Sequence, residues 1–278
     1  MDRVRHALIT ALVAAGVAVV PSSVAAQHCH IPAVDRPHAG PGDEHAAHRS
    51  PWWLRVATAA VAGATDVMGD ARDYEGLGAR LQAGRGRLSG HVGLSMYRVA
   101  GSGVGLGDAS AAAAVDLAPR GSLRVGLATS MTAPTGDADA GRGMGHIMVA
   151  GGAWARLERG RARLSLATTL AAAVGKDSEH LLHQRQAAGW PLVDPMNPRE
   201  VVTVARATGA LVPGRLDAGV QLTHAVPVVL DGSDRLVAAF LAQRTFGRYA
   251  IEVLIEAPLV GDPFVSRGLV EVSYHFSP

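Results

Sequence analysis

The sequence predicts an all-β fold: a single antiparallel up-and-down transmembrane β-barrel of about twelve strands. The first observation is alternation, because apolar residues occupy every second position of the last segment, 266–276, as in a strand with one apolar face. The second is that short and long connections alternate along the chain, which is typical of outer-membrane barrels. The third is composition, since charged residues are only 18% of the chain, below the ~25% of soluble domains.

The first segment, residues 1–26, has the pattern of a secretory signal peptide. A positively charged beginning is followed by an apolar stretch over 7–20 and by small residues at 24–26. We expect cleavage before Gln27 and export from the cytoplasm. An uncleaved anchor helix is the weaker alternative, because Pro21 ends the apolar stretch early.

Residues 27–51 are predicted to form a disordered, His-rich periplasmic leader. Imidazole and thiol groups are ligands for copper and zinc, so the leader either captures metal weakly or is only a solvated connection. Its single cysteine is the only one in the chain, which excludes an intrachain disulfide. The candidate ligands are His28, Cys29, His30, His38, His45 and His48.

Residues 52–278 are predicted to form the barrel. Apolar and polar residues alternate clearly in several segments, for example 87–99 and 121–133. The Ala-rich segments 109–118 and 167–174 also suit helices, but we interpret them as closely packed strands. The candidate strands are 52–63, 74–84, 87–99, 108–118, 121–133, 143–157, 161–174, 200–212, 215–226, 235–246, 248–258 and 266–276.

The connections between these strands alternate in length. Gly- and Pro-containing pairs such as Arg159-Gly160 and Pro213-Gly214 make tight turns, whereas 134–142 and 175–199 are long. Outer-membrane barrels have short periplasmic turns and longer outer loops. An even number of strands would also place both ends of the barrel in the periplasm.

The closing strand, 266–276, presents its apolar face to lipid and ends in the aromatics Tyr274 and Phe276. A C-terminal strand with an aromatic end resembles the signal that the barrel assembly machinery recognises. We therefore expect the outer-membrane lipid and this machinery to be partners of the chain, although Ser277 and Pro278 follow the last aromatic.

The segment 128–158 contains a strand, a Pro134-Thr135-Gly136-Asp137 turn and a returning Gly-rich strand. This arrangement resembles the family of outer-membrane transporters named for the meta-pathway of phenol degradation. The long loop with Pro191-Leu192-Val193-Asp194-Pro195 also fits the layout of that family. The resemblance implies a β-barrel with a transport role, and it supplies no catalytic residues.

Polar residues on the inward faces of the strands are the candidate functional groups. Arginines predominate among them, which would favour anionic solutes. The alternative is that the mixed charges only fill a narrow lumen through internal salt bridges. The candidates are Arg87, His91, Arg124, Arg161, Arg163, Arg215, Asp217, Glu252, Glu256, Arg267 and Glu271.

A second cluster combines thioether and imidazole groups at Met144, His146 and Met148, close to the predicted loop 134–142. Such ligands suit copper and other soft metals. A metal-handling protein for copper, zinc or nickel is therefore the main alternative function. The other account is that the methionines face lipid and that the histidine lies in a loop.

The sequence favours a passive channel or transporter for small solutes over an enzyme. It contains no Gly-x-Ser-x-Gly motif and no complete phosphate-binding loop, and we expect no catalysis. The net charge of +2 gives no basis for nucleic-acid binding. A closed structural barrel and a soluble secreted β protein are the remaining alternatives.

Overall fold

The computed structural model describes residues 52–67, 70–117, 122–174, 199–228, 234–261 and 264–276, all in strands, turns or loops. The segments 1–26 and 27–51, predicted as signal peptide and leader, lie outside the described residues. In the described part of the chain there is no helix long and apolar enough to cross a membrane. The strands are β1 (Trp52–Val67), β2 (Asp70–Arg85), β3 (Leu88–Val99), β4 (Gly103–Leu106), β5 (Ala109–Asp116), β6 (Leu123–Ala133), β7 (Ile147–Arg159), β8 (Ala162–Val174), β9 (Arg199–Val212), β10 (Leu216–Pro227), β11 (Arg235–Phe246), β12 (Tyr249–Val260) and β13 (Phe264–Phe276).

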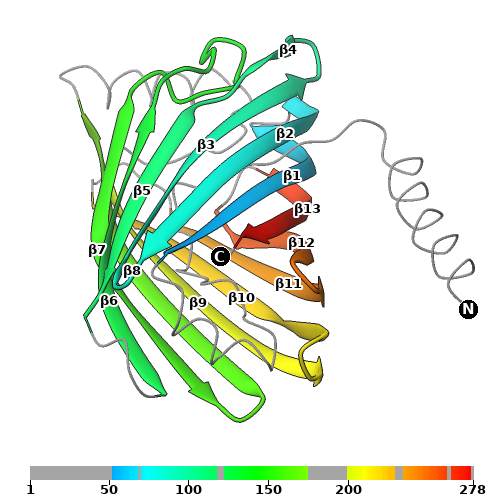
Figure 1. Ribbon diagram of the computed structural model, residues 1–278. Helices are drawn as coiled ribbons and strands as arrows, with labels where there is room; N and C mark the ends of the chain where they lie inside the picture. Colours follow the sequence, from blue (N-terminus) through cyan, green and yellow to red (C-terminus); the bar gives the residue numbers. More distant parts are fainter. Residues whose placement is uncertain are drawn as a thin grey trace, which may run out of the picture.

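The strands form one antiparallel sheet that closes on itself (Figure 1). Closure occurs between β1 and β13, where Leu54 pairs with Phe276 and Val61 pairs with Leu269. Twelve strands surround the barrel, and all twelve segments predicted from alternation are present. A closed sheet leaves no unpaired edge, which is the requirement for crossing lipid with strands.

The short strand β4 differs from the expectation, because it lies between the predicted strands 87–99 and 108–118, where no strand was predicted. It pairs with β3 at Met96–Val99, while β5 pairs with the other part of β3. β4 and β5 thus lie one after the other along β3, with β4 nearer one end of the barrel. Three of the residues in 103–107 are glycines, which hide the alternation that identifies a strand.

The outer face of the barrel is apolar. Large hydrophobic side chains are exposed on it at every second position, including Val270, Val272 and Phe276 of β13, as the alternation predicted. Tyr274 packs on Tyr249 and on Phe276, with ring centroids 4.7 and 4.4 Å apart. These aromatics gather where β12 begins and β13 ends, as in the interfacial girdle of a barrel.

The two ends of the barrel differ in their connections. At one end, called the turn end, four short turns contain Gly86, Gly160, Gly214 and Gly247 at φ of 58, 59, 67 and 60°. A positive φ strongly favours glycine. The opposite end, called the loop end, carries β4 and the longer connection 134–146.

The interior contains several small apolar clusters in place of one core. Near the loop end, Tyr74 and Tyr97 pack with Val61 and Val99. The ring of Tyr97 lies so close to Gly76 that a Cβ added there would overlap it. Glycine thus makes room for aromatic rings on the inner wall.

Candidate functional site

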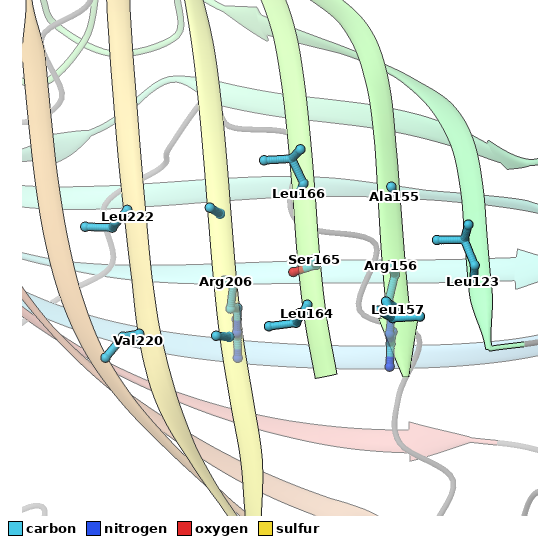
Figure 2. Close-up of a pocket in the computed structure, with 12 residues that line it drawn as sticks. Leu123, Ala155, Arg156, Leu157, Leu164, Ser165, Leu166, Arg206, Val220 and Leu222 are labelled. Atoms are coloured by element: carbon cyan, nitrogen blue, oxygen red, sulfur yellow. The ribbon is translucent and has the colours of Figure 1, made fainter. Parts of the chain in front are cut away.

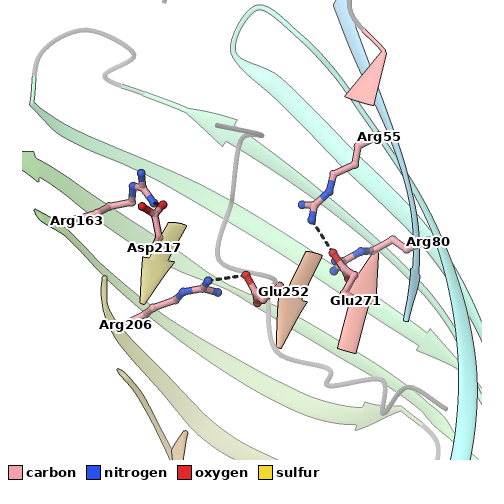
Figure 3. Close-up of polar contacts among 7 residues, drawn as sticks. All are labelled: Arg55, Arg80, Arg163, Arg206, Asp217, Glu252 and Glu271. Carbon is pink, nitrogen blue, oxygen red and sulfur yellow. Dashed lines mark hydrogen bonds and ion pairs between the residues drawn. The ribbon is translucent and has the colours of Figure 1, made fainter. Parts of the chain in front are cut away.

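A belt of ion pairs lines the inner wall toward the turn end of the barrel. Glu271 of β13 accepts hydrogen bonds from Arg55 of β1 at 2.6 Å and from Arg80 of β2 at 2.5 Å (Figure 3). Arg206 of β9 donates to Glu252 of β12 at 2.8 Å. These contacts join strands that are far apart in sequence across the interior.

The belt continues on the other side of the barrel. Arg163 of β8 lies 3.8 Å from Asp217 and 3.5 Å from Glu158. Glu158 also pairs with Arg156 at 2.5 Å. A further pair joins Arg124 and Asp116. Every carboxylate of the belt therefore has a guanidinium partner.

The charges of the belt nearly cancel. Six arginines contribute six positive charges and five carboxylates contribute five negative ones, which leaves a net charge of +1. The members are Arg55, Arg80, Arg124, Arg156, Arg163, Arg206, Asp116, Glu158, Asp217, Glu252 and Glu271. The wall thus presents alternating charges, and the guanidinium groups are already engaged by carboxylates.

A second layer of ion pairs lies farther along the strands, toward the loop end. Arg267 donates to Glu256 at 2.5 Å, with side chains only 2% and 3% exposed. Arg235 donates to both oxygens of Glu200 at 2.9 and 2.6 Å. In the belt, by contrast, the Arg80 side chain is 29% exposed. Solvent therefore reaches some side chains of the belt, whereas Arg55 and Asp116 are as buried as this second layer.

The loop 134–146 is held against the inner wall at the loop end by one carboxylate. Asp108, 6% exposed, accepts a hydrogen bond from the backbone N–H of Gly136 at 2.9 Å and from that of Met144 at 2.7 Å. One oxygen of the carboxylate binds the beginning of the loop and the other binds its end. Asp108 thus holds the two ends of the loop together, a role that we call a clasp.

Arg142 attaches the same loop to the turn between β3 and β4. Its guanidinium donates to the carbonyl oxygens of Ser102 at 2.6 Å and Gly103 at 3.3 Å, and to Asp137 at 2.9 Å. An added Cβ at Gly105 would lie 2.6 Å from this guanidinium. The guanidinium of this loop therefore lies over the inner face of β4, in space that the absence of a side chain at Gly105 leaves free.

The structure divides the predicted lumen residues into four groups. Arg163, Asp217, Glu252, Glu271 and Arg124 lie in the belt, and Glu256 and Arg267 form a pair of the second layer. His91 pairs in register with Gln82 on β2. The remaining three lie exposed in the short turns at the rim: Arg87, Arg161 and Arg215.

Several residues of this site were not among the sequence candidates. Arg55, Arg80, Arg156 and Arg206 belong to the belt, and Asp108 closes the loop. Each of the four arginines lies at an alternating position of a predicted strand, so strand alternation contained the information. The role of Asp108 depends on contacts with residues 28 and 36 positions away, which the sequence alone does not show.

The residues of the predicted Met/His cluster are all buried in the same segment of the barrel. Met144 and Met148 belong to one apolar cluster with Ala150 and Ala171, and His146 is buried between them in sequence. In the described residues, no group of three His, Cys, Asp or Glu side chains is arranged to hold a metal. The ligands predicted in 27–51 lie outside the described residues, so metal binding stays a prediction.

A closed antiparallel barrel with an apolar outside and a charged inside defines the transmembrane β-barrel class. No family model and no curated protein matches the sequence. An outer-membrane channel from Pseudomonas putida F1 has a similar structure, with a TM-score of 0.60 and 15% identity over 82% of this chain and 96% of that one. The NanC porin (TM-score 0.49, 9% identity, 81% and 99% covered) and the translocator domain of the autotransporter NalP from Neisseria meningitidis (0.45, 14%, 84% and 96%) also align. The first of these likenesses supports the barrel fold; the link to the phenol meta-pathway stays a prediction.

Proposed function

We propose that this protein is an outer-membrane channel that lets small solutes pass passively through its polar lumen. The observation that carries the proposal is the belt of ion pairs, part of it exposed to solvent, inside a closed barrel whose outside is apolar. Charged side chains on an inner wall stabilise water and polar solutes along a path through lipid. The fold shared with a bacterial outer-membrane channel supports the same function.

The selectivity of this channel is expected to be weak. The belt has a net charge of +1, and its arginines are paired with carboxylates. A paired guanidinium attracts a passing anion less than a free one, because the neighbouring carboxylate opposes it. We therefore propose small polar solutes of either charge as cargo, with only a slight preference for anions.

Export and assembly complete the proposal. Residues 1–26 would direct secretion and be removed, and Tyr274 and Phe276 would present the closing strand to the barrel assembly machinery. The short turns would then face the periplasm and the loop 134–146 would lie toward the cell exterior.

Single-channel recording in planar lipid bilayers tests the channel. The refolded protein should give discrete conductance steps, and the reversal potential in a salt gradient should show a small anion preference. A barrel that inserts, shown by heat-modifiable migration, but gives no steps would overturn the proposal. That result would favour a closed structural barrel, which the buried pairs Arg267–Glu256 and Arg235–Glu200 make the second candidate.

Metal handling is a third candidate because Met144 and Met148 are in one buried cluster, with His146 in the same segment. Isothermal titration of Cu(I), Zn(II) and Ni(II) into the protein, with and without residues 27–51, separates the sites. Tight binding that survives the truncation would place the metal in the barrel and promote this candidate. Binding that is lost with the leader would confine metal to residues 27–51.

A further inference from the structure

The outer face of the barrel has an open groove that extends over β6, β7, β8, β9 and β10 (Figure 2). It encloses about 340 Å³, a volume at the lower end of ligand pockets. At one side it is lined by residues of β6 and β7. In the part over β8, β9 and β10, called the trough, Ala205 and Ala207 of β9 lie between leucines and a valine of the two neighbouring strands.

The strand register explains why the groove forms. Leu164 of β8 and Val220 of β10 flank Ala207 in one row. In the next row Leu166 and Leu222 flank Ala205 in the same way. The four flanking side chains are 46% to 55% exposed, so they project beyond the alanines and leave a trough between them.

The small residues of the trough continue for one more row toward the turn end. The next row is Ala162, Gly209 and Ala218, and no atom lies within 4 Å of a Cβ added to Gly209. Small residues therefore continue the floor by one row beyond the groove, and Leu211, 64% exposed, is the next outward residue of β9 before the turn 213–215. A flexible apolar chain can lie in this trough and pass beside Leu211, so that its polar end reaches the rim.

The rim beside the trough is positively charged. Arg159, Arg161 and Arg215 are exposed there. The backbone N–H of Ala210 on β9 donates to the carbonyl of Arg161 at 2.9 Å, which places the turn of β7 and β8 directly beside the strand of the trough. Arg215 lies in the turn that follows β9, where its N–H donates to Val212 at 2.9 Å.

Carboxylates do not neutralise these three arginines on the outside. In 155–166 and 205–220 the sequence contains two carboxylates, Glu158 and Asp217. Both contact arginines on the inner wall, Glu158 through Arg156 and Arg163 and Asp217 through Arg163. The mouth of the trough therefore has an excess of positive charge.

We propose that this trough binds an anionic phospholipid, with one acyl chain along β9 and the phosphate at Arg159, Arg161 and Arg215. The proposal rests on the proposed function, which places this face in the membrane. Guanidinium groups bind phosphate oxygens with paired hydrogen bonds, and basic side chains at a membrane surface attract anionic lipids. An apolar chain in the trough would add burial of hydrocarbon.

A second copy of the chain fits this face less well than a lipid does. A dimer with its axis along the membrane normal would bring the same arginine-bearing turns of both copies together. Like charges facing each other at short distance repel. The charge at the mouth therefore favours an anionic headgroup as the occupant.

Native mass spectrometry of the delipidated full chain in detergent tests the site. Phosphatidylglycerol and phosphatidylcholine are added at equal concentration. We expect about tenfold tighter retention of phosphatidylglycerol. The variant with Arg159, Arg161 and Arg215 changed to Gln should lose this preference, and Ala207→Leu, which fills the trough, should lose retention of both lipids.

The matched control changes Arg85 and Arg87 to Gln, because these exposed arginines occupy the turn of β2 and β3, away from the groove. It should retain phosphatidylglycerol like the unchanged protein. Three results would overturn the site. The unchanged protein could retain the two lipids equally, or the control could lose as much phosphatidylglycerol as the variant of Arg159, Arg161 and Arg215. The third is a dimer peak that Ala207→Leu removes. Conductance of the unchanged protein tests the channel separately: lipid retention without conductance would refute only the channel.

Discussion

Replacing Asp108 by Ala should release the loop 134–146 from the inner wall. The carboxylate is buried and accepts two backbone hydrogen bonds, from Gly136 and Met144. Hydrogen bonds to a charged group contribute about 1.5–3 kcal/mol each, so the variant should lose roughly 3–6 kcal/mol of loop attachment. Since about 1.4 kcal/mol is a factor of ten, the released fraction should rise at least a hundredfold.

Limited proteolysis measures this release without any assumption about transport. Trypsin cleaves after arginine, and Arg142 is 9% exposed and bonded to Ser102. It should therefore be protected in the folded barrel and become cleavable in Asp108→Ala. In bilayers the same variant should show a larger or noisier conductance, because the loop no longer covers the inner face of β4.

The control is Asp73→Ala, which removes an exposed carboxylate from β2 at the same end of the barrel and should leave cleavage at Arg142 and conductance unchanged. Asp108→Asn keeps one acceptor oxygen and should give an intermediate rate of cleavage. Heat-modifiable migration shows that each variant is folded. Equal protection of Arg142 in a folded Asp108→Ala barrel would refute the role of this carboxylate as a clasp.

Three further predictions concern the wall of the barrel. Arg163→Glu changes the belt from +1 to −1 beside Asp217, so the reversal potential should move toward cations; an unchanged potential would place Arg163 off the conducting path. Replacing Tyr274 and Phe276 by Ala removes packed girdle aromatics and should reduce the yield of heat-modifiable barrel in the membrane fraction. An unchanged yield would show that assembly does not need these two side chains. Gly76→Val should lower the free energy of unfolding by roughly 2 kcal/mol, because the ring of Tyr97 occupies the space that the new side chain needs. Denaturant unfolding measures this loss, and an unchanged midpoint would contradict the packing.

The strands were predictable because alternation of apolar and polar residues directly reflects a two-sided wall. The same alternation gave the inward face of Arg163 and Glu271. It could not give the height of a residue along the barrel axis, and for that reason Arg87, Arg161 and Arg215 were grouped with the lumen although they lie in turns. Side-chain parity tells only which face a residue occupies.

Partners across the barrel were not predictable from the sequence. Arg55 and Glu271 are 216 positions apart, and their contact depends on closure between the first and last strands. Closure brings the carboxylate of Glu271 on the last strand next to Arg55 and Arg80 on the first two strands. An excess of arginine on individual strands therefore became a nearly neutral wall once all the strands were assembled.

The glycine-rich segment 101–107 and the Pro-Thr-Gly-Asp turn form one structural unit. Thr135 accepts a hydrogen bond from the N–H of Ala109 and donates to the carbonyl of Gly107, both at 2.8 Å. A Cβ at Gly136 would lie 3.0 Å from Asp108 and from the backbone of Gly107.

These contacts explain why both segments are rich in glycine, because two backbones meet there without room for side chains. Arg142 then joins the loop to the carbonyl oxygens of the turn before β4. Any opening of the loop must break the bonds of Asp108, Thr135 and Arg142 together. The loop is therefore expected to move as a unit, and a substitution that weakens one of these bonds should also loosen the other two.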